Sequence, residues 1–123
     1  MSAARRALPL WLALATVYTL VWALGAGPGA DVSAQIEAAR LLTHRAALEK
    51  DRGDSFTLTA AQAKLITGRL AVKAAEEAVQ IHGGYGYIEE YPVCRFYRDA
   101  KILTIGEGTD EVQQMVIARQ LGC

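Results

Sequence analysis

The stretch that decides the fold is TLTAAQAKLITGRLAVKAAEEAVQIHGG, residues 57–84. Two rows of residues recur in it at seven-residue spacing, one apolar and one small. The rows are Leu58, Leu65, Val72 and Val79, and Ala61, Gly68 and Ala75. Residues seven apart share a helix face, so the pattern predicts one long helix whose small row lets another helix approach closely. The helix is predicted to start near Thr57 or Thr59, where Thr59 and Gln62 have the spacing of a capping box, and to end at Gly83 and Gly84.

Shorter helices are predicted on both sides of this one. Ser33 is a predicted N-cap for an amphipathic helix that runs to about Lys50. Thr109 is a predicted N-cap for a last helix that ends before Gly122. Residues 83–106 predict a loop with a short helix inside it, which carries most of the aromatic side chains. Because no strand alternation is visible after residue 30, the predicted fold class is all-α.

Length and charge exclude several classes of protein. The chain has 123 residues, which suffice for one domain, and 13 Lys plus Arg balance 13 Asp plus Glu. Without a net positive charge, nucleic acid is not an expected partner. Cys94 and Cys123 lack the spacing of a zinc site, and neither His44 nor His82 has a partner at metal-ligand spacing, so no metal site is predicted.

The first 29 residues differ from the rest. Two arginines precede an uncharged apolar run at residues 7–26, which as a helix would reach about 30 Å, the thickness of a bilayer core. Three interpretations stay open: a membrane-spanning helix, a secretory signal, or a foreign sequence joined by a truncated or shifted reading frame. A break rich in glycine follows, which divides the chain into an N-terminal segment, residues 1–29, and a helical domain, residues 30–123.

Three features of the helical domain suggest chemistry, and each also has a structural explanation. Glu107 lies between two glycines just before a helix, where it would suit a general base if burial raised its pKa toward neutrality, although a lone glutamate in a loop is usually only solvated. The glycines at 83–86 offer bare backbone to a ligand, or simply end a helix. The backbone N–H groups of residues 109–111 open a helix and would bind an anion or a cofactor, although capping alone explains them equally well.

Three ordered blocks carry a resemblance to a known family. They are IEAARLLTHRAA (36–47), AVQIHGGYGYIEEYPVCRFYRDAKI (78–102) and IGEGTDEVQQMVIARQL (105–121). Together they resemble the C-terminal helical domain of the acyl-CoA dehydrogenase family. The resemblance implies a helical bundle that also mediates tetramer formation, and a cytoplasmic location; membrane association through residues 7–26 is the alternative.

The resemblance also implies an activity and its residues. Family members use FAD to oxidise acyl-CoA thioesters to trans-2-enoyl-CoA, and commonly pass the electrons to an electron-transferring flavoprotein. Glu107 matches the base that removes the α-proton, and Gly108 matches a substrate-contacting glycine. Two further sets match cofactor-binding segments, one reaching the FAD of a neighbouring subunit and one touching the flavin's ribityl and phosphate region. These sets are Gln80, Ile81, His82, Gly83 and Gly84, and Thr109, Asp110 and Glu111.

The sequence departs from the family pattern upstream of the helical domain. Relatives place a helical domain and a β-domain there, and the apolar run occupies that position in this chain. The isolated 123-residue chain is therefore expected to retain little FAD and to have no turnover. Two alternatives remain: a membrane-anchored helical interaction module, and a non-catalytic fragment that oligomerises with full-length relatives through residues 57–82.

Overall fold

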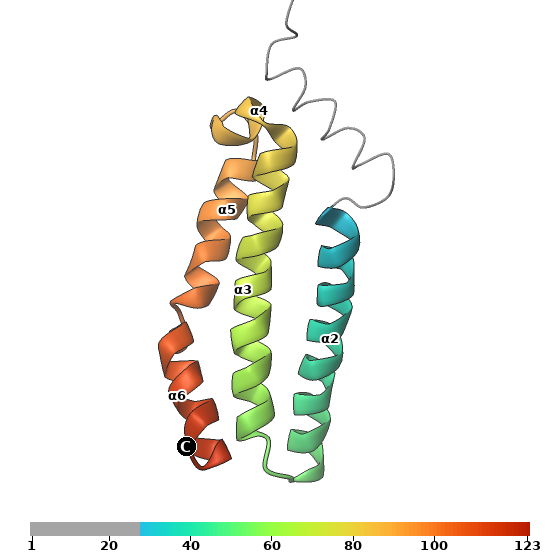
Figure 1. The fold of residues 1–123 in the computed structure, drawn as a ribbon, viewed down its shortest axis with the longest axis vertical. Helices are drawn as coiled ribbons and strands as arrows, with labels where there is room; N and C mark the ends of the chain where they lie inside the picture. The colour runs from blue at the N-terminus through green and yellow to red at the C-terminus, as the bar shows by residue number, and fades with distance from the viewer. Residues whose placement is uncertain (1–27) are drawn as a thin grey trace, which may run out of the picture. The chain divides into compact units, whose positions relative to one another are not determined.

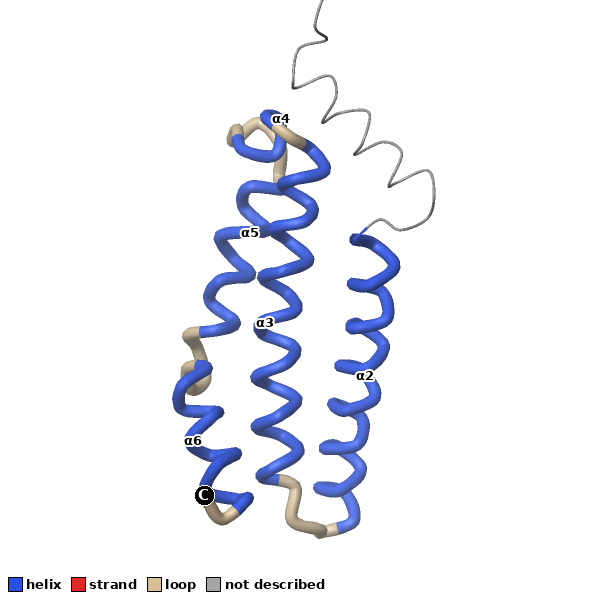
Figure 2. The backbone as a smooth tube through the Cα atoms, in the orientation of Figure 1, coloured by secondary structure: helices blue, strands red, loops and turns tan. Residues whose placement is uncertain are grey.

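A computed structural model describes residues 28–123 of the chain. The predictions for the apolar run at residues 7–26 lie outside the described residues. Residues Val32–Cys123 form one compact unit. No strand occurs among the described residues, and the tube in Figure 2 is helical apart from short connections. The predicted all-α class is confirmed for this part of the chain.

Five α-helices and one 3-10 turn make up the described residues. They are α2 (Pro28–Arg52), α3 (Thr57–His82), α4 (Gly84–Tyr87), α5 (Val93–Lys101), the 3-10 turn η1 (Ile102–Thr104) and α6 (Asp110–Leu121). Helix α3 lies in the middle, with α2 on one side and with α5 and α6 following one another along the other side (Figure 1). The long helix predicted from residue 57 is thus the element on which α4, α5, η1 and α6 pack.

The small-residue row of α3 is buried, as predicted. Ala61, Gly68 and Ala75 all lie in the core, together with Ala63 and Leu70 of the same helix. A Cβ atom added to Gly68 would lie 2.6 Å from the carbonyl oxygen of Leu103. Glycine is therefore required for the approach of η1 to α3, and this packing offsets the ~1 kcal/mol by which glycine disfavours a helix relative to alanine.

One predicted helix start and one predicted cap are wrong, whereas the predicted start of the long helix near Thr57 is confirmed. Helix α2 begins at Pro28, so Ser33 lies inside it instead of capping it; proline is tolerated in a first turn because it needs no N–H partner there. Helix α3 begins at Thr57 after Phe56, with no side-chain cap. Thr59 is buried, and its hydroxyl bonds to Glu49 of α2 and lowers the pKa of that carboxyl. The predicted capping box therefore does not form.

The other predicted ends are confirmed. The backbone N–H of Val112 donates to the hydroxyl of Thr109, which caps α6. Gly122 follows α6 in the left-handed region (φ 80°), and Gly83 follows α3 with φ 57°. Positive φ is costly for residues with a Cβ atom, so glycine marks both ends.

The core of the described residues consists of small side chains. Its apolar members are Ala39, Ala46, Ala61, Ala63, Leu70, Ala75 and Val93. Several larger apolar side chains are instead about half exposed, among them Leu41 (61%), Leu48 (53%) and Ile66 (45%).

None of the helices within residues 28–123 has both the length and the apolar character that crossing a membrane requires.

Replacement of Gly68 tests the close approach of η1 to α3. We expect Gly68→Ala to lower the free energy of unfolding by about 1 to 2 kcal/mol, because overpacking costs roughly 1–3 kcal/mol and outweighs the helix propensity gained. Urea unfolding followed by circular dichroism measures the change. Gly84→Ala is the control, since an added Cβ meets nothing within 4 Å there. A Gly68→Ala chain as stable as this control would contradict the packing described.

Candidate active-site loop

The loop that connects η1 to α6 contains two consecutive residues in the left-handed backbone region. Glu107 has φ 55° and Gly108 has φ 88°. Among the described residues, Glu107 is the one residue other than glycine with a positive φ. Left-handed backbone costs a residue with a Cβ atom roughly 1–2 kcal/mol, and such outliers concentrate at functional sites. The glutamate is therefore held where a glycine would be less strained.

Hydrogen bonds from two side chains converge on the carbonyl groups of this loop. The ammonium group of Lys64, on α3, donates to the carbonyl oxygen of Gly108 over 2.6 Å. The side-chain amide of Gln113, on α6, donates to the carbonyl oxygens of Glu107 (3.2 Å) and Gly108 (3.3 Å). A Cβ atom added to Gly108 would lie 2.6 Å from that amide nitrogen. The loop is thus bound to the helices on both sides of it.

Glu107 lies in the wall of a groove of about 450 Å³ between α3 and the η1 segment. The groove is lined by Lys64, Thr67, Gly68, Ile102, Leu103, Gly106 and Glu107. Ile102 is 57% exposed and Leu103 is 48% exposed, so the apolar wall is accessible to a ligand. Glu107 is itself exposed. The groove therefore presents a carboxylate beside apolar surface, but residues 28–123 do not enclose it.

Thr109, Asp110 and Glu111, which the resemblance predicts to bind the cofactor, lie at the start of α6. The guanidinium Nε of Arg69, on α3, donates to Asp110 Oδ2 over 2.8 Å. Asp110 Oδ1 is buried and accepts no hydrogen bond. The Thr109 hydroxyl, followed by a backbone N–H, lowers the pKa of Glu111. The structure thus places the predicted residues 107–111 together.

The predicted residues at the end of α3 lie elsewhere. Gln80 follows Arg69 by eleven residues, or roughly 16 Å along the helix at ~1.5 Å per residue. Residues 80–84 are exposed, and His82 Nδ1 donates to the carbonyl oxygen of Ala78 over 2.8 Å. One copy of the chain therefore presents the two predicted cofactor-binding sets at separate places.

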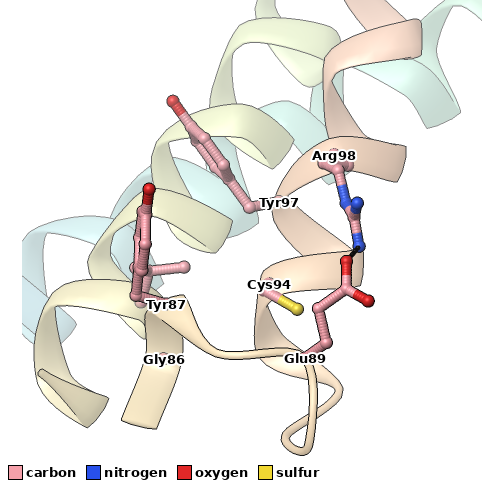
Figure 3. Close-up of a pocket in the computed structure, with 7 residues that line it drawn as sticks. Gly86, Tyr87, Glu89, Cys94, Tyr97 and Arg98 are labelled. Carbon is pink, nitrogen blue, oxygen red and sulfur yellow. Dashed lines mark hydrogen bonds and ion pairs between the residues drawn. The ribbon is translucent and has the colours of Figure 1, made fainter. Parts of the chain in front are cut away.

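A second pocket, of about 320 Å³, was not predicted. Two of its lining residues form an ion pair, in which Arg98 of α5 donates to Glu89 Oε1 over 3.0 Å (Figure 3). Cys94 also lines this pocket. The pair is nine residues apart across Pro92, a spacing that no helical period relates. The lining residues are Val79, Gly86, Tyr87, Glu89, Cys94, Tyr97 and Arg98. No cluster of three metal-ligating side chains lies within residues 28–123.

The strain at Glu107 can be measured. We expect Glu107→Gly to raise the free energy of unfolding by about 0.5 to 1 kcal/mol, since relief of the left-handed strain exceeds the entropy that glycine adds to the unfolded chain. Thermal or urea unfolding provides the measurement. Glu107→Gln keeps the Cβ atom and should leave stability within about 0.5 kcal/mol of the parent. Destabilisation by the glycine variant would show that the loop is not strained.

Comparison with known proteins supports the resemblance. The family model described as "Acyl-CoA dehydrogenase, C-terminal domain" matches residues 23–122. The short-chain specific acyl-CoA dehydrogenase of Megasphaera elsdenii is 58% identical over 87 residues, which cover 71% of this chain and 23% of that relative. The caffeyl-CoA reductase–Etf complex subunit CarC of Acetobacterium woodii is 48% identical over 92 residues, which cover 75% of this chain and 24% of that relative.

The fold agrees with a solved structure. The chain of butyryl-CoA dehydrogenase from Megasphaera elsdenii superimposes with a TM-score of 0.73 at 54% sequence identity, over 76% of this chain and 24% of that one. The chain spans about a quarter of the length of the relatives that it matches. Because the family model covers most of the sequence, this chain belongs to the acyl-CoA dehydrogenase family and corresponds to its C-terminal helical domain.

Proposed function

We propose that this chain provides the catalytic base and part of the cofactor surface of an FAD-dependent oxidoreductase that dehydrogenates acyl-CoA thioesters between Cα and Cβ. The observation that carries the proposal is the position of Glu107, whose backbone is strained and which lines an apolar groove. An acyl chain needs apolar contacts, and removal of an α-proton needs a fixed base. Family membership supplies the reaction class.

The role proposed for Glu107 is to accept the pro-R α-hydrogen of the acyl group as a proton on its carboxylate. The backbone N–H of Glu107 would donate to the thioester carbonyl oxygen, which stabilises the negative charge that develops there. Gly108, which has no side chain, would let the substrate approach the backbone. FAD, when bound, supplies the acceptor for the hydride that leaves the β-carbon.

Residues 109–111 suit the flavin cofactor. Backbone N–H groups at the start of a helix favour phosphate or other anionic groups. Asp110 Oδ1, a buried acceptor without a partner, would accept from a hydroxyl such as those of the ribityl chain. Thr109 and Glu111 would lie at the same turn.

The distance between the two cofactor-binding sets supports a homo-oligomer. Residues 80–84 lie roughly 16 Å along α3 from the Arg69–Asp110 contact, so we propose that they reach the FAD of a second copy. Electron-transferring flavoprotein is the proposed electron acceptor. The Acetobacterium woodii relative, which is named as a subunit of a CoA reductase–Etf complex, supports that partner.

A second candidate function is non-catalytic oligomerisation with relatives of full length. The exposed apolar side chains of α2 and α3, such as Leu41 and Ile66, favour it because another helix would cover such side chains. This function gives no reason for a glutamate at φ 55°, so the catalytic proposal explains more of the structure.

The isolated 123-residue chain is expected to be inactive. Ile102 and Ile105 are more than half exposed beside Glu107, so the described residues alone do not exclude water from a bound thioester. We expect no bleaching of flavin absorbance when the purified chain is mixed with FAD and butyryl-CoA. Robust bleaching that Glu107→Gln abolishes would show that the isolated chain is active.

A chimera tests the role of Glu107 itself. Residues 30–123 would replace the matching last quarter of the Megasphaera elsdenii enzyme, which provides the remaining domains. We expect butyryl-CoA to bleach the flavin of this chimera, and Glu107→Gln to slow the bleaching at least about 10²-fold, because general-base catalysis contributes typically 10²–10⁴-fold. Glu76→Gln, on an exposed position of α3, is the matched control. Unchanged bleaching in the Glu107→Gln chimera would refute the assignment.

A further inference from the structure

We propose that Lys64 is a positioning residue that holds the backbone of the Glu107 loop in its left-handed conformation by donating to the carbonyl oxygen of Gly108. The inference rests on the proposed function, in which Glu107 is the base. The inference adds Lys64 to the residues proposed for the site. Lys64 lies 44 residues before Gly108, outside the sequence motif of the loop.

The loop needs an external restraint because its conformation is intrinsically unfavourable. Glu107 and Gly108 both have positive φ, and the Cβ atom of Glu107 makes relaxation to negative φ favourable. A relaxed loop would turn the peptide planes on both sides of Glu107. The carboxylate and the backbone N–H that are proposed to face the substrate would then move together.

Lys64 is suited to provide this restraint. Its ammonium group carries a full charge, and the 2.6 Å bond to a carbonyl oxygen is short for an N–H donor, as charge-assisted bonds are. Its side chain is half-buried against the loop, which limits competition from water. The donor also comes from α3, the central helix, whose position does not depend on the loop.

The other contacts of the loop do not replace this bond. Gln113 donates to the carbonyl oxygens of Glu107 and Gly108, but its amide is neutral and its bonds of 3.2 and 3.3 Å are longer than the 2.6 Å bond from Lys64. Arg69 holds Asp110 at the start of α6, beyond the strained residues, and its side chain is 52% exposed. Lys64 is therefore the side chain that fixes the strained backbone relative to α3.

Nuclear magnetic resonance of the 123-residue chain tests the bond directly. In the unmodified chain we expect a through-hydrogen-bond coupling between the Lys64 side-chain nitrogen and the Gly108 carbonyl carbon. We also expect a strong nuclear Overhauser effect between the amide and α protons of Glu107, which is typical of positive φ. If the coupling between the Lys64 nitrogen and the Gly108 carbonyl carbon is absent, the proposal is overturned without any variant.

Variants then test the consequence of the bond. Lys64→Met, which keeps an unbranched side chain one atom shorter but removes the donor, should lower the order parameters of Glu107 and Gly108 from about 0.85 to below about 0.6. Lys64→Arg should restore them. Lys73→Met removes an ammonium group from the same helix, where it bonds to Gln35, and should leave the loop unchanged. Unchanged order in Lys64→Met, or an equal loss in Lys73→Met, would overturn the proposal.

The chimera described above separates this inference from the proposed function. Lys64→Met should reduce the rate of flavin bleaching at saturating butyryl-CoA about 100-fold, the scale expected for a misplacement of about 1 Å, with a KM within about twofold. Lys64→Arg should recover most of the rate. If the proposed function fails, Glu107→Gln has no effect while the order of the loop still depends on Lys64. If this inference fails, Glu107→Gln abolishes bleaching and Lys64→Met does not slow it.

Discussion

The contact between Gly68 and the backbone of Leu103 is the constraint on which the rest of the structure depends. It brings η1 against α3 at a distance that no other residue at position 68 would permit without displacement. The chain after η1 then passes beside Lys64, four residues before Gly68 on the same helix, so the loop carbonyls come within reach of its ammonium group. The groove that Glu107 lines has Gly68 in its wall for the same reason. A missing side chain on one helix thus determines where a carboxylate lies 39 residues later in the sequence.

The sequence predicts the parts of this fold that depend on local chemistry. The length of α3, its buried small row, the cap at Thr109 and the end at Gly122 all follow from periodicity or from a single turn, and each was confirmed. The predicted cap at Thr59 was wrong because its hydroxyl has a partner on α2, which local spacing does not reveal. The same limit applies to the bond between Lys64 and Gly108, because a contact between residues 44 apart produces no periodic pattern in the sequence. The glycines flanking Glu107 were a usable signal for its backbone conformation, whereas nothing in the sequence pointed to the Glu89–Arg98 pocket.

The predicted site residues divide into two groups along α3. One group, at residues 107–111, is organised by side chains of α3 and α6. The other group, at residues 80–84, is exposed at the opposite end of the helix and has few tertiary restraints. The apolar wall beside Glu107 is about half exposed, so the groove that it lines is open within residues 28–123.

The alanine-rich core has a thermodynamic consequence. Unfolding raises the heat capacity mainly by exposing apolar surface, and average domains gain about 12–15 cal/mol/K per residue. Helices that bury methyl groups and leave Leu41, Leu48 and Ile66 partly in water expose less new surface when they melt. The increment for these helices is therefore smaller than average, which flattens the curve of their stability against temperature. Association that covers those leucine and isoleucine side chains adds to the increment, so calorimetry at increasing protein concentration registers assembly as a stronger curvature.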